Sequence, residues 1–168
     1  MAFTEILPGI HYVGVNDRTT TRFESLWSLP YGVSYNSHLV IDEKVALIDT
    51  VEVSFGEQFI DNIRAILKDR PIDYLVVDHM EPDHSATLSE LLLRHPETTV
   101  VCNDKTAVMI AQFFGKDAVK NMHLVKEGDV LSAGAHELTF YLAPMIHWPE
   151  VMTVSYTHLR AHETPEHL

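Results

Sequence analysis

The sequence predicts an α/β layered fold in which helices cover a mixed β-sheet. Two observations lead to this fold class. Segments typical of β-hairpins occupy the first fifty residues, and helical and strand-like segments alternate between residues 54 and 125. Hairpins supply antiparallel strands, whereas strands separated by helices supply parallel ones. With 168 residues and 46% hydrophobic content, the chain can form the core of one ordinary domain.

The first fifty residues are expected to be mostly β structure. Residues 10–15 alternate weakly between apolar and polar side chains. Residues 34–41 and 45–48 are strand-like, and the charged turn at 42–44 between them predicts a hairpin. Residues 23–33 are rich in aromatic side chains, Pro and Gly, which predicts an irregular loop.

The first expected helix begins at a capping box formed by Ser54 and Glu57. Phe59 and Ile63 follow at the spacing of a core-facing helical stripe. The helix must end before Pro71, because the residue before a proline disfavours helical backbone.

Two further helices and four strands complete the expected pattern. Residues 86–94 form one helix, and Asp104 caps another in which Val108 and Ile110 face the core and Gly115 marks the end. The expected strands are 72–77, 98–101, 123–125 and 137–142.

Charge and composition limit the partners. The chain has 12 Lys and Arg against 24 Asp and Glu, a net charge of −12, with no basic stripe that could neutralise phosphates. Nucleic acid and anionic membranes are therefore poor candidates. No apolar run reaches the roughly 18 residues that a bilayer requires, so a cytoplasmic location is expected. The single Cys102 excludes both an internal disulfide and a cysteine-based zinc site.

One short run carries the candidate chemistry. His79, Glu81, Asp83 and His84 can all bind a metal, and they directly follow the apolar strand at 72–77. In an extended chain the first three would point the same way, and a turn at Pro82 would bring His84 beside Asp83. Ligands packed this closely suit a pair of metal ions better than a single ion.

His147 is a candidate fifth ligand. It follows the last expected strand and lies between Pro144 and Pro149, next to Trp148, in a segment that should hold it rigidly. A lone histidine is weak evidence for a metal site, so this assignment depends on the run at 79–84.

Several segments together resemble the flavodiiron proteins, also called A-type flavoproteins. These segments are residues 33–37, 47–50, 79–84 and 143–149, and the match extends from about residue 4 to residue 152. The resemblance implies the N-terminal part of a metallo-β-lactamase-like αββα fold with a non-haem diiron site, followed in the family by a flavodoxin-like domain that binds FMN. Members of the family reduce dioxygen to water or nitric oxide to nitrous oxide.

The resemblance also implies ligand roles and partners. His79, Glu81 and His147 would bind one iron, and Asp83 and His84 the other. A rubredoxin-like protein or a flavin reductase would supply electrons, and the full-length protein would be a head-to-tail homodimer. The family has a bridging Asp and a final His that this chain does not match. Glu166 falls near the spacing of the Asp, but its surroundings differ, so it is not counted as a ligand.

The chain is expected to divide into two parts. Residues 1–153 would form a partial diiron domain, and the flavodoxin-like domain would be absent. Residues 154–168 resemble a non-native, adaptor-derived tail, so His158 and His162 at i, i+4 spacing are not counted as a metal site.

Two metal chemistries are in contention. Related hydrolases of this fold use His-x-His-x-Asp-His, which suits two zinc ions. Glu81 replaces the middle histidine with a hard anionic oxygen, which favours iron and redox chemistry. The alternative is a dizinc metallo-β-lactamase-like hydrolase, and a third possibility is that the chain binds no metal.

Other residues could support the site. Asp49, at a strand end, either steadies a metal ligand or forms a turn, with the sequence favouring neither. Phe23, Trp27, Tyr31 and Trp148 could line an apolar access pocket, although simple core packing is the more common role of such residues.

Overall fold

The computed structural model describes residues 4–23, 25–156 and 159–161 and confirms the α/β layered fold. Its main sheet is mixed and contains, in spatial order, β1 (Thr4–Leu7), β2 (Ile10–Tyr12), β7 (His38–Ile41), β8 (Val45–Ile48), β9 (Tyr74–Val76), β10 (Thr99–Cys102) and β11 (Asn121–Leu124). The strands from β8 to β11 pair in parallel, and those from β1 to β8 pair antiparallel.

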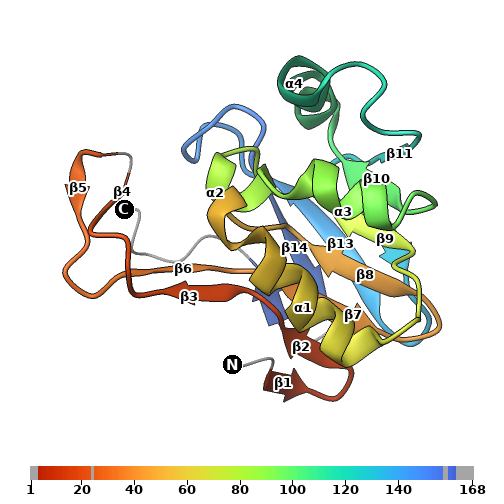
Figure 1. Cartoon of the computed structure of the whole chain (residues 1–168). Helices are drawn as coiled ribbons and strands as arrows, with labels where there is room; N and C mark the ends of the chain where they lie inside the picture. The colour runs from red at the N-terminus through yellow and green to blue at the C-terminus, as the bar shows by residue number, and fades with distance from the viewer. Residues whose placement is uncertain (1–3, 24, 157–158, 162–168) are drawn as a thin grey trace.

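A second, antiparallel sheet lies against one face of the main sheet (Figure 1). Its strands are β12 (Val130–Ser132), β13 (Glu137–Leu142), β14 (Met152–Tyr156) and β15 (Leu159–Ala161). The opposite face of the main sheet is covered by helices (Figure 1). The helical segments are the 3₁₀ turn η1 (Val53–Phe55), α1 (Gly56–Leu67), α2 (Pro82–Ser85), α3 (Leu88–Arg94) and α4 (Asp104–Phe114).

The period-2 geometry of the strands divides the core into two layers. Leu39 and Leu47 point toward the helices, whereas their neighbours Val40 and Ile48 point toward the second sheet. All four residues of β8 are buried, as expected of a strand covered on both faces. The centre of the main sheet is therefore fully enclosed.

A pair of short ribbons extends from this body. β3 (Val15–Asp17) pairs with β6 (Val33–Tyr35), and β4 (Arg22–Phe23) pairs with β5 (Trp27–Ser28) farther out (Figure 1). The sequence predicted one strand at 34–41 and an irregular loop at 23–33. Both predictions were wrong in detail, because the chain leaves the main sheet between β6 and β7 and forms a hairpin within the expected loop.

The helix starts also differ from the predictions. Glu52 caps η1 by accepting from the Ser54 N–H at 2.7 Å, and α1 then begins at Gly56 without a side-chain cap. The predicted capping box of Ser54 and Glu57 was therefore wrong. Residues 82–85 form the separate helix α2, with Pro82 at its first turn, so the expected helix at 86–94 is shorter.

The last helix, α4, is capped one residue earlier than predicted. The Asn103 side chain accepts from the N–H groups of Lys105 and Thr106 at 3.0 Å each, so Asp104 is the first helical residue. Val108 is 58% exposed and does not face the core. Gly115, with φ of 97°, ends α4 as predicted.

Strand β14 crosses residue 153, the expected boundary between the diiron domain and the tail. β14 continues to Tyr156, and Val154 is buried in the core between the two sheets. Residues 157–158 and 162–168, which include His158, His162 and Glu166, lie outside the described residues. The assignment of residues 154–168 to a non-native tail stays a prediction.

The Asp17 side chain, at the end of β3, holds the segment that leads to β4. Its Oδ1 accepts from the Thr19 N–H and hydroxyl at 2.7 Å each and from the Thr20 N–H at 3.0 Å. Burial alone would raise the pKa of Asp17, but these donors outweigh it and lower the pKa to about 2. The ionised carboxylate is thus the form that the fold stabilises.

We expect Asp17→Ala to lower the free energy of unfolding by about 1–2 kcal/mol at pH 7, since it removes hydrogen bonds to a charged group. In the unsubstituted chain this contribution is fully present above the ordinary pKa of 3.8 and is lost as the pH falls toward about 2. Denaturant unfolding between pH 2 and pH 7 measures both effects. Asp117→Ala, at an exposed turn, is the matched control, and equal stability of the two variants would contradict the prediction.

Candidate metal centre

The site lies at the carboxyl end of the parallel strands. β9 ends at Val76, and the residues after it contact the loop that joins β13 to β14 and the start of β14. Two backbone hydrogen bonds fix these segments, from Met152 N–H to the Asp78 carbonyl at 3.0 Å and from Asp49 N–H to the Val76 carbonyl at 2.9 Å. Segments far apart in sequence therefore meet at one place, as in other open α/β sheets.

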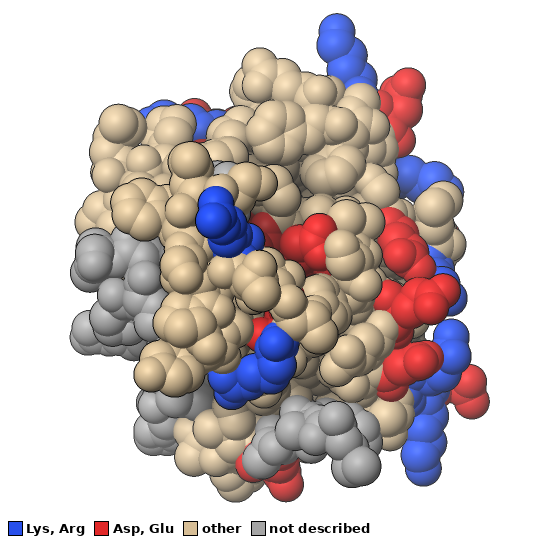
Figure 2. Space-filling view, turned by 60° about the vertical axis from the view of Figure 1, so that its left-hand side comes forward, with Lys and Arg blue, Asp and Glu red and all other residues tan. Residues whose placement is uncertain are grey.

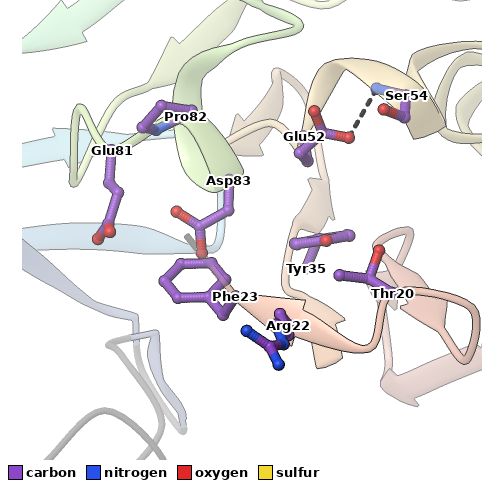
Figure 3. Close-up of a pocket in the computed structure, with 9 residues that line it drawn as sticks. All are labelled: Thr20, Arg22, Phe23, Tyr35, Glu52, Ser54, Glu81, Pro82 and Asp83. Atoms are coloured by element: carbon purple, nitrogen blue, oxygen red, sulfur yellow. Dashed lines mark hydrogen bonds between the residues drawn. The ribbon is translucent and has the colours of Figure 1, made fainter. Parts of the chain in front are cut away.

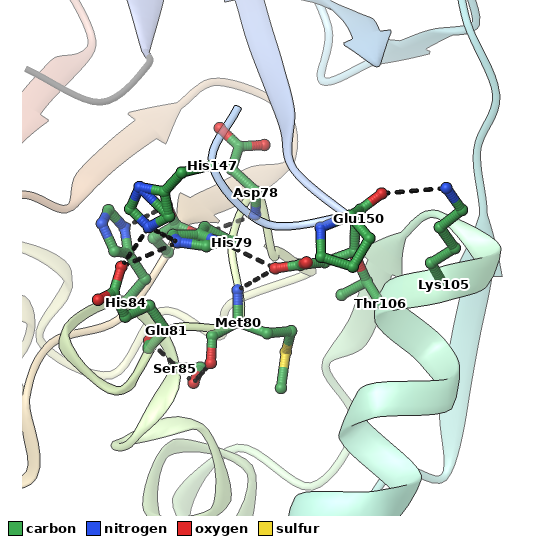
Figure 4. Close-up of polar contacts among 12 residues, drawn as sticks. Asp78, His79, Met80, Glu81, His84, Ser85, Lys105, Thr106, His147 and Glu150 are labelled. Carbon is green, nitrogen blue, oxygen red and sulfur yellow. Dashed lines mark hydrogen bonds and ion pairs between the residues drawn. The ribbon is translucent and has the colours of Figure 1, made fainter. Parts of the chain in front are cut away.

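Three predicted ligands converge there (Figure 4). Glu81 Oε2 lies 3.1 Å from His79 Nε2 and 2.9 Å from His147 Nε2, and the two imidazole nitrogens are 3.3 Å apart. Their ligand atoms all lie within 4.8 Å of one another, and no other such group of three occurs among the described residues. The pKa of Glu81 is lowered, chiefly by its hydrogen bond with His79, so the carboxylate is ionised at neutral pH.

The other two predicted ligands are adjacent. His84 and His79 have ring centroids 5.2 Å apart, and His84 Nε2 is 3.7 Å from Asp83 Oδ2. The expected extended geometry was wrong for Asp83, because Pro82 begins helix α2 rather than a turn. The structure thus brings all five predicted residues to one end of the sheet, as a group of three beside a pair.

Asp49 contacts the candidate ligand His84 directly and also has a left-handed backbone, with φ of 55°, so the structure agrees with both roles expected of it. Its Oδ2 lies 3.0 Å from His84 Nδ1, and its Oδ1 accepts from the Asp78 N–H at 2.7 Å. Burial alone would lower the pKa of His84, but the hydrogen bond and charge of Asp49 outweigh burial and raise the pKa. With Nδ1 facing Asp49, Nε2 of His84 is directed toward Asp83.

Glu150 is a site residue that the sequence reasoning missed. Its Oε1 lies 2.8 Å from His79 Nδ1 and accepts from the Met80 N–H at 3.0 Å. Burial would raise the pKa of Glu150, yet these contacts outweigh burial and lower it. The available signal was an acidic residue three positions after His147, within the same rigid segment as Trp148 and Pro149.

A pocket of about 300 Å³ opens beside the ligands (Figure 3). One side is lined by Glu81, Pro82 and Asp83, and the other by side chains of the ribbon and of the segment before α1. These latter residues are Thr20, Arg22, Phe23, Tyr35, Glu52 and Ser54. In the space-filling view, acidic side chains lie in a depression near the centre, with basic side chains to the left of it and below it (Figure 2).

The four aromatic residues agree only in part with the predicted pocket lining. Phe23 lines the pocket, and the Trp148 ring packs edge-on against His79 with centroids 5.2 Å apart. Trp27 and Tyr31 are 67% and 83% exposed and line no part of it. The pocket beside the ligands is therefore mixed in polarity rather than a purely aromatic channel.

The sequence is similar to those of two curated bacterial proteins. An anaerobic nitric oxide reductase flavorubredoxin of Pectobacterium atrosepticum is 39% identical over 145 residues, which cover 85% of this chain and 28% of the relative. A rubredoxin-oxygen oxidoreductase of Megalodesulfovibrio gigas is 35% identical over 153 residues, covering 90% of this chain and 38% of the relative. The chain thus spans well under half the length of these curated relatives.

Two solved structures are also similar to this chain. The flavodiiron protein of Giardia intestinalis matches with a TM-score of 0.81 and 27% identity, over 93% of this chain and 38% of that one. A rubredoxin oxygen:oxidoreductase from Desulfovibrio gigas matches with a TM-score of 0.84 and 33% identity, over 91% and 38%. These matches confirm the expected metallo-β-lactamase-like fold, N-terminal part. Within the described residues, no helix is long and apolar enough to cross a bilayer.

We expect Asp49→Asn to lower the pKa of His84, because only the charge of Asp83 then opposes the effect of burial. Titration of the His84 ring protons by NMR in metal-free protein measures this. Asp42→Asn is the matched control, since it removes a carboxylate paired with His136 at the other end of β8. A His84 pKa that stays raised in Asp49→Asn would contradict the assigned role of Asp49.

The remaining comparison identifies the family. A model of the "ODP family beta lactamase" matches residues 33–160, a span that contains all five candidate ligands together with Asp49 and Glu150. Together with the flavodiiron relatives, this match shows that the chain belongs to the ODP beta-lactamase family and has the fold of the N-terminal diiron domain of flavodiiron proteins.

Proposed function

We propose that this chain is the metal-binding portion of a cytoplasmic flavodiiron oxidoreductase that reduces dioxygen to water, nitric oxide to nitrous oxide, or both. The observation that carries the proposal is the convergence of His79, Glu81 and His147 within 4.8 Å. The names of its relatives, a nitric oxide reductase and a rubredoxin-oxygen oxidoreductase, support the same class of reaction.

The residues present fit iron. Two imidazoles and one carboxylate meet at a single point, a donor set typical of non-haem iron. Asp83 and His84 offer a carboxylate and an imidazole for a second ion next to it. Glu81 adds negative charge where a purely histidine set would have none, and an anionic oxygen favours the ferric state.

The candidate ligands, Asp49 and the pocket have separate roles in this proposal. His79, Glu81 and His147 hold one iron, and Asp83 and His84 hold the other. Asp49 keeps His84 directed toward Asp83 through its 3.0 Å contact. The pocket beside Glu81 and Asp83 is large enough to admit diatomic molecules. When bound, the iron pair would supply the site at which the diatomic substrate is reduced.

The electron supply and assembly follow from the family. FMN, carried by a flavodoxin-like part of the longer protein, would deliver electrons to the irons. A rubredoxin-like protein or a flavin reductase would reduce the flavin, and the longer protein would form a head-to-tail homodimer. The relative named rubredoxin-oxygen oxidoreductase supports the first of these donors.

Metal selectivity tests the proposal. We expect the chain, exposed anaerobically to equal Fe²⁺ and Zn²⁺ and then dialysed, to retain iron over zinc, with partial loading because the second position has only two of the described ligands. Elemental analysis measures the metal per chain. His147→Ala should lower iron retention by about tenfold or more, since losing a direct ligand costs at least as much as losing an outer partner.

The controls separate the alternatives. His123→Ala removes an exposed histidine on β11 and should leave iron retention unchanged. Tight zinc binding together with ester or β-lactam hydrolysis would favour the dizinc hydrolase instead. Failure of the unsubstituted chain to retain either metal would refute the metal site in this chain.

A further inference from the structure

We propose that Glu150 is a positioning residue that assembles the metal centre. Its carboxylate sets the orientation and tautomer of His79 and ties the loop that carries His147 to the segment that carries His79. The proposal rests on the proposed metal site but does not depend on which reaction occurs there.

The first step concerns the His79 ring. Glu150 Oε1 lies 2.8 Å from His79 Nδ1, and an ionised carboxylate can only accept a hydrogen bond. Nδ1 must then carry a proton. Nε2 faces Glu81 and His147, at 3.1 and 3.3 Å, and in the tautomer protonated on Nδ1 alone its lone pair is available to a metal ion bound there. The other tautomer would direct an N–H into the ligand set and prevent His79 from binding a metal.

The second step concerns the backbone. The same Oε1 accepts from the Met80 N–H at 3.0 Å, so Glu150 holds both the ring of His79 and the peptide that follows it. Glu150 lies three residues after His147 in the loop between β13 and β14. A single carboxylate therefore joins the two loops that supply the three converging ligands.

The third step concerns what holds Glu150 itself. The Asn103 side chain donates to the Glu150 carbonyl at 2.6 Å, and Lys105 Nζ donates to the Pro149 carbonyl at 3.1 Å. Asn103 is also the cap of α4, so this end of the loop is fastened to the start of a helix. The carboxylate is thus presented from a fixed support rather than from a mobile loop.

The burial of Glu150 argues against a role in stability alone. Its side chain is 0% exposed, and Oε2 has no hydrogen-bond partner among the described residues. A buried carboxylate that is only partly hydrogen-bonded is costly compared with an apolar side chain of similar size. A cation held by His79 would offset this cost, because the negative charge makes the imidazole a stronger ligand.

The experiment reads the tautomer and the metal affinity separately. In the metal-free 168-residue chain at pH 8, ¹⁵N NMR of the histidine rings should show His79 protonated on Nδ1. In Glu150→Gln the amide can donate as well as accept, so we expect a mixture of both tautomers and an Fe²⁺ affinity about 10–100-fold weaker. Calorimetry with Fe²⁺ alone under anaerobic conditions measures the affinity.

Glu137→Gln is the matched control, because it neutralises an exposed carboxylate on β13 that makes no contact with the site. It should leave the His79 tautomer and the Fe²⁺ affinity unchanged. A His79 ring without a proton on Nδ1 in the unsubstituted chain would overturn the proposal without any variant. An unchanged tautomer and affinity in Glu150→Gln would overturn it as well. If the unsubstituted chain shows the Glu150-dependent tautomer yet binds no metal, the positioning role holds and the proposed function fails.

Discussion

The whole site depends on the parallel, in-register pairing of β8 with β9. This pairing places Asp49 and Asp78, the residues just beyond the two strands, side by side, and the Asp78 N–H donates to Asp49 Oδ1 at 2.7 Å. Because β8 is buried on both faces, a shift of register by one residue would exchange the side chains packed against the helices with those packed against the second sheet and disrupt both layers of the core. The core therefore fixes the position of Asp49, and Asp49 in turn fixes His84.

The sequence predicted the parts of this arrangement that local patterns encode. Buried strands, amphipathic helices and the cluster of ligand-type residues at 79–84 are visible as hydrophobic periodicity and as an excess of His, Asp and Glu. Residue types also indicated that His147 belonged with that cluster. The structure brings it to 2.9 Å from Glu81.

What the sequence could not predict depends on contacts between distant segments. Glu150 is an ordinary acidic residue in the sequence, and its role is visible only because the β13–β14 loop folds over His79. Strand 34–41 divides because the chain leaves one sheet for another, which no periodicity of 2 can show. The predicted helix starts were wrong because the capping side chains are those of Glu52 and Asn103, which lie just before the predicted caps Ser54 and Asp104.

The pocket has a consequence for how such proteins diversify. One wall consists of Glu81 and Asp83, which the buried sheet holds in place, whereas the opposite wall includes Arg22 and Phe23 from a ribbon with its own strand pairing. The two walls are therefore separate structural modules. Substitutions in the ribbon can change the size and polarity of the entrance while the positions of Glu81 and Asp83 stay the same, so the two walls of the pocket can evolve independently.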